Sequence, residues 1–236
     1  MTPFIAAILG GILCALIAAA FLTPLTFRIP LRISRQWARE VDEYAELELS
    51  GDNLAAAPLT RTQSVLLILA SALLGCATVA TKGLQAEGMA LAFYFLSLLL
   101  LVAINMRALL LPDIVVLPVL WAGLLYHAQA GSAAEHIYGA TAAYLAPFLL
   151  TTALQRFTGK GLIGHGDLKT MAMAGAWFGL ASLPLFFMGF VAGFALWIVL
   201  LLIRGQRTQG PICSGPAHLT GGLTAAFCSM PIAPFA

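Results

Sequence analysis

The run from Met89 to Met106, MALAFYFLSLLLLVAINM, decides the fold class of this chain. It contains no charged side chain, and about 20 mostly apolar residues suffice for a helix to cross the hydrocarbon core of a bilayer. A backbone inside lipid must satisfy its own hydrogen bonds, and a helix does so within one segment. This run therefore predicts a membrane-spanning helix with one amide side chain, Asn105, near its end.

The rest of the chain has the same character. Of its 236 residues, 61% are hydrophobic and 9% are charged, and the mean hydropathy is +0.94. A soluble domain is about half apolar and a quarter charged, so too few charges remain here to cover a water-facing surface. The composition excludes a soluble enzyme, a disordered chain and a nucleic-acid-binding module, and it predicts membrane lipid as the surrounding medium.

Further apolar segments flank that run, at residues 3–27, 64–81, 112–130, 136–157, 168–182, 184–203 and 217–233. Together they predict an all-α, polytopic membrane bundle of about eight transmembrane helices. The polar stretch at 28–63 predicts either an amphipathic helix over 33–49 at the membrane surface or a solvated connecting loop. The chain thus divides into residues 1–63, a first transmembrane helix with a short cytoplasmic loop, and a larger part at 64–236.

The distribution of charge orients these helices. Alternating crossings that start outside place one of the 12 Lys and Arg residues, Lys82, on the outer side and the others on the cytoplasmic side. Cytoplasmic loops carry such an excess of Lys and Arg. Basic residues also follow the first apolar segment instead of preceding it, which is typical of a retained anchor and not of a signal peptide. We expect both termini in the periplasm.

Two acids lie where ionisable groups are costly in a membrane protein. Asp113 opens the segment at 112–130, and Asp167 stands just before the segment at 168–182. The topology puts both at the cytoplasmic membrane boundary, at the level where Asn105 ends its own segment. Ionisable residues in such places are functional candidates by default, so we expect these three side chains to converge.

The residues before Asp167 are Gly164-His165-Gly166. Glycine has no Cβ, so another backbone can approach closely here, and an acid in the first turn of a helix is stabilised by the helix dipole. The pattern fits a functional carboxylate at a helix entrance. It also fits a glycine-rich loop followed by an ordinary capping aspartate.

Four stretches, in chain order, resemble the motifs of type IV prepilin peptidases. They are Phe21–Pro30 (FLTPLTFRIP), Leu110–Trp121 (LLPDIVVLPVLW), Gly164–Gly179 with its Gly-x-Gly-Asp-Leu-Lys start, and Ser214–Leu219 (SGPAHL). Gly-x-Gly-Asp alone is a weak signal, but ordered matches over nearly the whole chain are specific. The resemblance implies that residues 64–236 form an intramembrane aspartyl protease core in the bacterial inner membrane.

The resemblance also implies the chemistry. Two aspartates would share a proton and cut the basic leader from type IV prepilins or pseudopilins at the cytoplasmic face, without a metal ion. Asp167 would be one of the two catalytic residues, and the supporting residues would be Asp113, Gly164, Gly166 and Lys169. Many family members also methylate the new N-terminus, with S-adenosylmethionine as the methyl donor.

The first catalytic position departs from the family's pattern. The family's first aspartate lies eight residues before the aspartate of Leu-Pro-Asp, and that position holds Asn105 here. An amide cannot act as a general base, so the resemblance implies that the chain as written is inactive. Three explanations stay open: Asp113 substitutes for the missing acid, the chain is a naturally inactive homologue, or an aspartate has been replaced by asparagine.

The polar stretch at 28–63 is the second departure. Many family members carry two Cys-x-x-Cys pairs there that bind zinc, whereas the four cysteines of this chain form no such pair. We therefore expect no zinc, and methyltransferase activity is in doubt. Two further functions stay open: a non-catalytic membrane scaffold that binds prepilins, and a small transporter that uses Asp113 and Asp167 as a proton relay.

Labelling of single cysteines from either side of the membrane tests the topology. In a cysteine-free background, positions 158–163 should react with an impermeant reagent from the cytoplasmic side and positions 83–87 from the outside, because that arrangement follows the positive-inside rule. Reaction of position 87 from the cytoplasm would contradict the topology, and with it the shared membrane face of Asn105 and Asp167.

Overall fold

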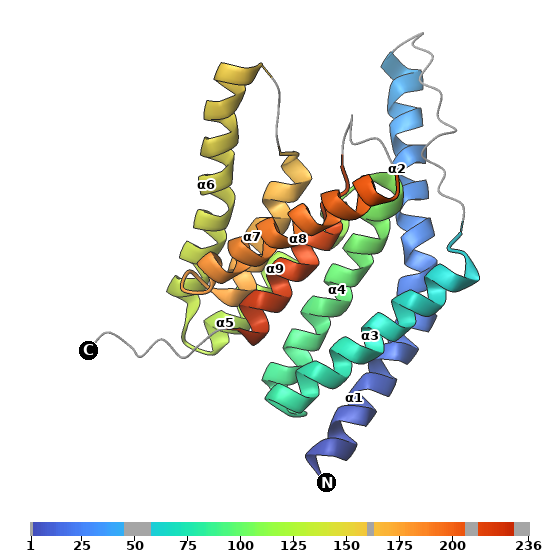
Figure 1. The fold of residues 1–236 in the computed structure, drawn as a ribbon, viewed down its shortest axis with the longest axis vertical. Helices are drawn as coiled ribbons and strands as arrows, with labels where there is room; N and C mark the ends of the chain where they lie inside the picture. The colour runs from blue at the N-terminus through green and yellow to red at the C-terminus, as the bar shows by residue number, and fades with distance from the viewer. Residues whose placement is uncertain (1, 45–57, 160–162, 206–211, 229–236) are drawn as a thin grey trace. The chain divides into compact units, whose positions relative to one another are not determined.

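The computed structural model describes residues 2–44, 58–159, 163–205 and 212–228, which fold into helices joined by short turns (Figure 1). The elements are α1 (Pro3–Ile17), the π-helical turn η1 (Ala18–Leu22), α2 (Thr23–Tyr44), α3 (Arg61–Lys82), α4 (Ala86–Ala108), α5 (Asp113–Gln129), α6 (Ala133–Thr158), α7 (His165–Phe178), α8 (Leu183–Ile203) and α9 (Gly215–Phe227). The all-α prediction is confirmed for these residues. The helices group into two compact units, Met1–Leu110 and Leu111–Ala236.

The first unit contains one long helix followed by the pair α3 and α4. Helices α1, η1 and α2 follow one another without a break, and α2 passes through Pro30. The helix expected over 33–49 is confirmed as far as Tyr44, where it continues the first helix instead of forming a separate one. Its remaining residues lie outside the described part of the chain.

The contact between α1 and α3 depends on small residues. A Cβ added at Gly75 of α3 would lie 2.6 Å from the sulfur of Cys14 and 2.8 Å from the carbonyl oxygen of Gly10. A Cβ at Gly11 would likewise overlap the sulfur of Cys76. Small residues let helix backbones approach closely inside a membrane, where van der Waals packing holds helices together. The glycines therefore determine how closely these two helices pack.

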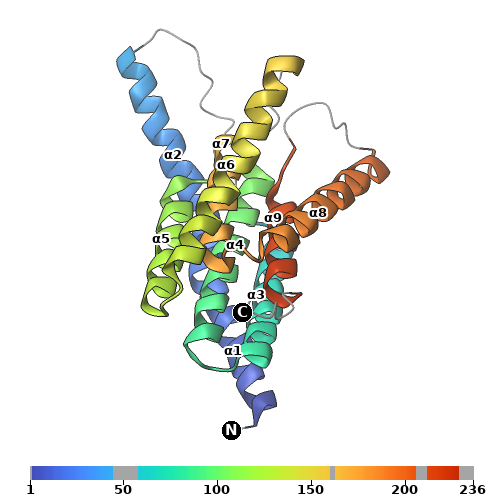
Figure 2. The ribbon, with the colours of Figure 1, turned by 90° about the vertical axis from the view of Figure 1, so that its left-hand side faces the viewer.

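Helix α7 is the most enclosed helix of the second unit. It packs against α5, α6 and α9, and Figure 2 shows it beside α5 and α6. Its residues from Thr170 to Trp177 are all buried. The approach to α6 requires glycine on both sides, because a Cβ at Gly175 would lie 2.5 Å from the carbonyl carbon of Gly139.

Threonines and glycines join α8 to α9. The hydroxyls of Thr220 and Thr224 donate to the carbonyl oxygens of Gly189 and Leu185, both at 2.9 Å. A Cβ at Gly189 or Gly193 would overlap these threonine side chains. The two helices thus pack closely, and α9 donates two hydrogen bonds to the backbone of α8, which fixes the position of α9 within the second unit.

Within the described part of the chain, five helices are long and apolar enough to cross a membrane: Pro3–Gln36, α3, α4, Ala133–Phe157 and α8. Helices α5, α7 and α9 have 17, 14 and 13 residues. At about 1.5 Å per residue they are shorter than the roughly 30 Å of a bilayer core. The expectation of about eight transmembrane helices is therefore confirmed only for five.

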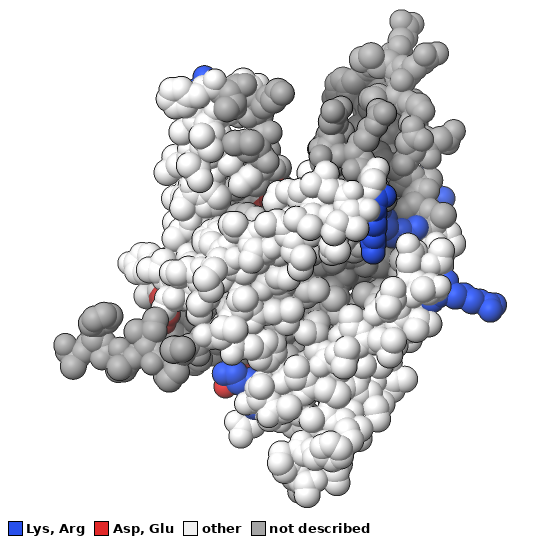
Figure 3. Space-filling model, viewed as in Figure 1, with Lys and Arg blue, Asp and Glu red and all other residues white. Residues whose placement is uncertain are grey.

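One of these short helices, α7, is apolar for a different reason. From Met171 to Trp177, α7 is apolar on all sides because protein covers it, whereas the spanning helices present apolar side chains on their outer faces, such as Leu73, Leu149 and Val191. Figure 3 shows how few charged atoms lie on the face in view. Such a surface suits lipid, and the side of the membrane on which the termini lie stays a prediction.

Gly123 provides a test of the packing in the second unit. The indole N–H of Trp177 in α7 donates to the carbonyl of Val119 in α5 at 2.8 Å, and a Cβ at Gly123 would lie 2.6 Å from the indole nitrogen. Gly123→Val should displace the ring and destabilise the fold by about 1–3 kcal/mol, measured as a lower Tm in detergent. Leu125→Val, at a side chain 64% exposed on the same helix, is the control. Equal losses in both variants would contradict this packing.

Candidate active site

Asp167 occupies the first turn of α7. Gly164 caps the helix in an extended conformation (φ −75°, ψ 152°), so His165 is the first helical residue and Asp167 the third. An acid at the third position can bond back to the backbone of the capping residue, and it interacts favourably with the helix dipole. The carboxylate of Asp167 does take part in a hydrogen bond with the backbone of Gly164. The expectation of an acid at a helix entrance is confirmed.

Gly166 lets the Leu-Pro-Asp motif come close to this turn. A Cβ at Gly166 would lie 3.1 Å from the Cβ of Leu111, which is closer than ordinary packing. Leu111 is followed by Pro112, the N-cap of α5, and by Asp113, the first residue of α5. The missing side chain at position 166 therefore allows the start of α5 to meet the start of α7.

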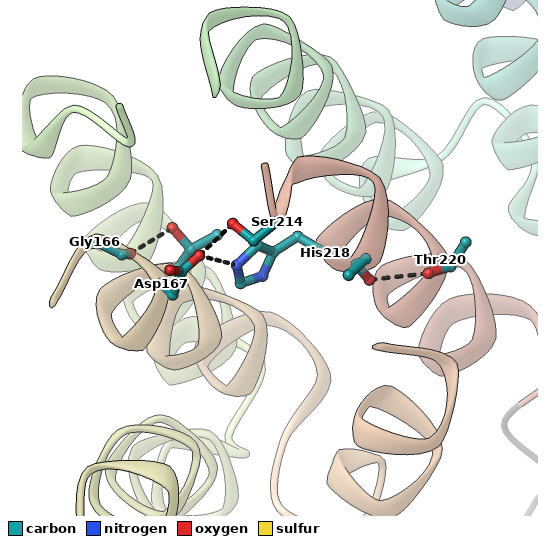
Figure 4. A network of polar contacts seen from close by, with 7 residues as sticks. Gly166, Asp167, Ser214, His218 and Thr220 are labelled. Carbon is teal, nitrogen blue, oxygen red and sulfur yellow. Dashed lines mark hydrogen bonds and ion pairs between the residues drawn. The ribbon is translucent and has the colours of Figure 1, made fainter. Parts of the chain in front are cut away.

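Two side chains from the start of α9 bond the carboxylate of Asp167 (Figure 4). The hydroxyl of Ser214 donates to Oδ1, and Nε2 of His218 lies 3.1 Å from the same oxygen. Ser214 is the N-cap of α9 and His218 lies one helical turn further on, so both side chains are on one face of the helix. The site thus joins the entrances of α7 and α9.

His218 is enclosed by apolar side chains. Its side chain is 1% exposed, its ring packs edge-on against Phe190 with centroids 4.9 Å apart, and within the described residues its Nδ1 has no hydrogen-bond partner. An imidazolium would bury an N–H without an acceptor, at a cost of about 1–3 kcal/mol. The neutral ring with its proton on Nε2 is therefore the form that fits, and this form donates to Asp167.

Hydrogen bonding decides the ionisation of Asp167, which lies outside the five candidate spans. Burial alone would raise the pKa of its carboxyl group, because burial disfavours the charged form. The hydrogen bond with His218 and the positive charge that this ring carries when protonated, together with the hydrogen bonds of Ser214 and the Gly164 backbone, outweigh burial and hold this pKa below its ordinary value. Burial raises the pKa of the neighbouring Cys213 thiol, and the charge of Asp167 raises it further. The site therefore holds an ionised carboxylate beside a neutral thiol.

Lys169 pairs with Asp113 and not with Asp167. Its Nζ lies 2.5 Å from Oδ2 of Asp113, and the two side chains are 33% and 51% exposed. An exposed pair of this kind contributes at most about 1 kcal/mol. The structure thus brings the supporting residues of α5 and α7 together, but it gives them a partnership that the sequence did not predict.

Asn105 belongs to the first unit, in the last turn of α4. Its side chain is buried, at 4% exposed, and its backbone carbonyl accepts from the N–H of Leu109 at 2.9 Å. Leu109 ends the helix in the left-handed conformation, with φ of 51°. Asn105 therefore lies near a helix end, as expected, and its sharing of a site with Asp167 stays a prediction.

Ser214 and His218 were not predicted as site residues. The stretch Ser214–Leu219 entered the sequence analysis only as a motif of the family, with no secondary structure assigned, and in the structure its residues from Gly215 onward begin α9. A proline in the first turn is a common start of a helix, and Pro216 provides that signal. Once a helix is assumed, the spacing of four places both side chains on one face.

Across the described ranges, no group of three or more His, Cys, Asp and Glu side chains is arranged to hold a metal ion. The expectation that zinc does not bind stays a prediction, for metal analysis of the purified protein to decide.

Fold and site together define a multi-pass helical membrane protein with a hydrogen-bonded carboxylate at the entrance of a short, enclosed helix. Residues 92–203 match the profile of the Type IV leader peptidase family. A prepilin leader peptidase/N-methyltransferase of Pectobacterium carotovorum is 35% identical over 70% of this chain and 58% of its own length. Proteins of the same name from Aeromonas hydrophila and Neisseria gonorrhoeae are 38% and 28% identical, over 50% and 94% of this chain. The chain belongs to the type IV leader peptidase family.

The extent of these matches differs between relatives. The matched part spans about half of the first two relatives, with 58% of the Pectobacterium protein and 42% of the Aeromonas protein covered, and 90% of the Neisseria protein. The search of solved structures found no match. The family membership therefore rests on sequence similarity. The geometry of the site described above comes from the structure of this chain and not from that of a relative.

The two glycines before Asp167 should respond differently to substitution. Gly166→Val should lower the free energy of unfolding by about 1–3 kcal/mol, because the valine side chain would collide with Leu111. The loss is measured as a lower Tm. Gly164→Ala is the matched control, since a Cβ there would lie 3.4 Å from the Asp167 carboxylate, an ordinary contact, and the backbone is extended. A Tm for Gly166→Val equal to that of Gly164→Ala would contradict the close approach.

Proposed function

We propose that this chain is a prepilin leader peptidase. Its substrates would be type IV prepilins or pseudopilins, cut after their basic leader at the cytoplasmic face of the bacterial inner membrane. The observation that carries this proposal is the carboxylate of Asp167, held by hydrogen bonds at the entrance of α7 within the Gly-x-Gly-Asp motif of a leader peptidase family. The names of the relatives support the substrate class.

Hydrolysis by two carboxyl groups requires one that accepts a proton and one that donates it. In the proposed reaction Asp167 takes a proton from water as the water oxygen bonds to the scissile carbonyl carbon. The second carboxyl group polarises the carbonyl by donating a hydrogen bond to its oxygen. The proton that Asp167 took from water then passes to the amine as the carbon–nitrogen bond breaks. The products are a leader with a new carboxylate and a mature pilin with a free amine.

The second role belongs to position 105. Asn105 can donate a hydrogen bond from its amide, but it cannot transfer a proton. We therefore propose that the chain as written binds prepilins without cutting them efficiently. The ion pair with Lys169 occupies the carboxylate of Asp113, which argues against Asp113 as the substitute acid.

Asn105 also favours the alternative function, a non-catalytic scaffold that binds prepilins. Both functions share the substrate and differ in turnover alone. The relatives' names include N-methyltransferase, so methylation of the new N-terminus remains part of the proposal, with S-adenosylmethionine as donor and without zinc. No residue of the site described above is assigned to that reaction.

Position 105 decides between the enzyme and the scaffold. With a synthetic prepilin in proteoliposomes, the chain as written should bind the substrate and leave it uncut, whereas Asn105→Asp should cut it about 10²- to 10⁴-fold faster, the usual contribution of a general acid–base group. Cleavage is measured by mass spectrometry of the released leader, and binding by co-sedimentation.

Two further variants serve as controls in the Asn105→Asp background. Asp167→Asn should abolish cleavage, because it removes the proton acceptor, and Asp113→Asn should reduce cleavage much less. Full cleavage by the unmodified chain, together with its loss on Asp113→Asn, would move the second catalytic role to Asp113 and overturn this assignment.

A further inference from the structure

Ser214 and His218 are polar side chains for which the peptidase reaction above has no use. They are 7% and 1% exposed, whereas the side chain of Asp167 is 20% exposed. A peptide or a water molecule that reaches the site can therefore touch Asp167 while these two remain covered. Any influence they have on the reaction passes through Asp167.

We propose that Ser214 and His218 are positioning residues that keep the carboxylate of Asp167 oriented and ionised, which makes Asp167 the proton acceptor of the catalytic pair. The inference rests on the proposed function and deepens it, because it assigns the two roles within the pair. Both donors converge on one oxygen, Oδ1, so this carboxylate accepts two hydrogen bonds from a single helix.

The two donors differ in how strongly each favours the ionised form of Asp167 over the protonated form. If Asp167 becomes protonated, the hydroxyl of Ser214 can rotate and accept a hydrogen bond instead, because a hydroxyl is both donor and acceptor. The ring of His218 has no such freedom. Moving its proton to Nδ1 would bury that N–H without a partner and turn a lone pair of Nε2 toward the carboxylate. His218 should therefore have the larger effect.

Other titratable groups lie on the elements around the carboxylate. His165 and Lys169 share α7 with Asp167, and Asp113 opens α5. Lys169 is engaged by Asp113, and the thiol of Cys213, just before α9, is neutral. Helix α8 carries no ionisable side chain. His218 and Ser214 are thus the side chains whose removal tests the ionisation of Asp167 most directly.

The inference has a consequence for position 105. If Asp167 holds the negative charge, the partner carboxyl carries the shared proton. A protonated carboxyl and an amide have nearly the same shape, and both can donate a hydrogen bond. Asparagine at position 105 then resembles the resting form of the partner, although it cannot release a proton. An asparagine can therefore take the place of the family's aspartate at position 105 while the rest of the motif stays the same.

Infrared titration of the full chain as written, in lipid nanodiscs, tests the inference without catalysis. The C=O band of protonated Asp167 is identified by its absence in Asp167→Asn. His218→Leu should move the appearance of this band to higher pH, because the lost donor favoured the ionised form, and Ser214→Ala should move it less. His218→Gln, whose amide nitrogen can take the place of Nε2, should restore the titration in part.

Thr141→Ala is the matched control, since the hydroxyl of Thr141 is exposed on α6 and donates to the carbonyl of Ile137 in its own helix at 2.8 Å. Its titration should equal that of the unmodified chain. Unchanged titration in Ser214→Ala and in both His218 variants, with the fold intact by circular dichroism, would overturn the inference. Should His218→Leu fail to fold, Ser214→Ala and His218→Gln decide the question.

Cleavage adds a second readout in the Asn105→Asp background. The acidic limb of the pH profile should move to higher pH in His218→Leu, and cleavage on that limb should fall about ten- to a hundredfold, the weight of one hydrogen bond to a charged group. Cleavage on the alkaline side should stay within a few fold. If Asn105→Asp does not cut prepilin at all, the proposed function fails, while the infrared titration still decides the role of His218 and Ser214.

Discussion

The hydrogen bonding of one partly buried carboxylate, that of Asp167, determines how the second unit is organised. Removing an ionised group from water is costly unless hydrogen bonds replace the lost hydration, and for Asp167 helix α9 provides them. The donors, Ser214 and His218, can reach Asp167 only if α9 is correctly placed. Thr220 and Thr224 meet that condition by bonding to the backbone of α8. On the other side, Gly166 sets the distance between the start of α7 and the start of α5.

Glycines, which have no side chain, are as important for this arrangement as the side chains that form hydrogen bonds. Between Gly139 and Gly175 there is no room for a single added carbon, and the same holds between Gly189 and Thr224. Inside a membrane, where lipid solvates apolar side chains as well as protein does, such close backbone packing is a main source of helix association. The enclosed position of α7, and with it the low exposure of the site, follows from these contacts.

The helices were predictable because apolar runs with polar ends are a local pattern. Which helices cross the bilayer was less predictable: the part of α7 from Met171 to Trp177 and a lipid-facing helix are both apolar on all sides, and only packing tells them apart. Asp167 was predictable as an acid in an apolar setting. Ser214 and His218 were not, because their partnership with Asp167 joins α7 to α9, and nothing local in either segment indicates the other.

Burial at position 105 complements the hydrogen bonding at Asp167. Asn105 is 4% exposed at the end of α4, where its backbone carbonyl accepts a hydrogen bond from the N–H of Leu109, the left-handed residue that ends the helix. A carboxyl group in such a buried place is less costly when neutral than when charged. Asp167 is more exposed, and the donors of α9 favour its charged form. If position 105 and Asp167 act on one substrate as proposed, the donors at Asp167 assign the charge to Asp167 and leave the shared proton to an acid at position 105, and an amide there would lack the proton that the proposed reaction needs.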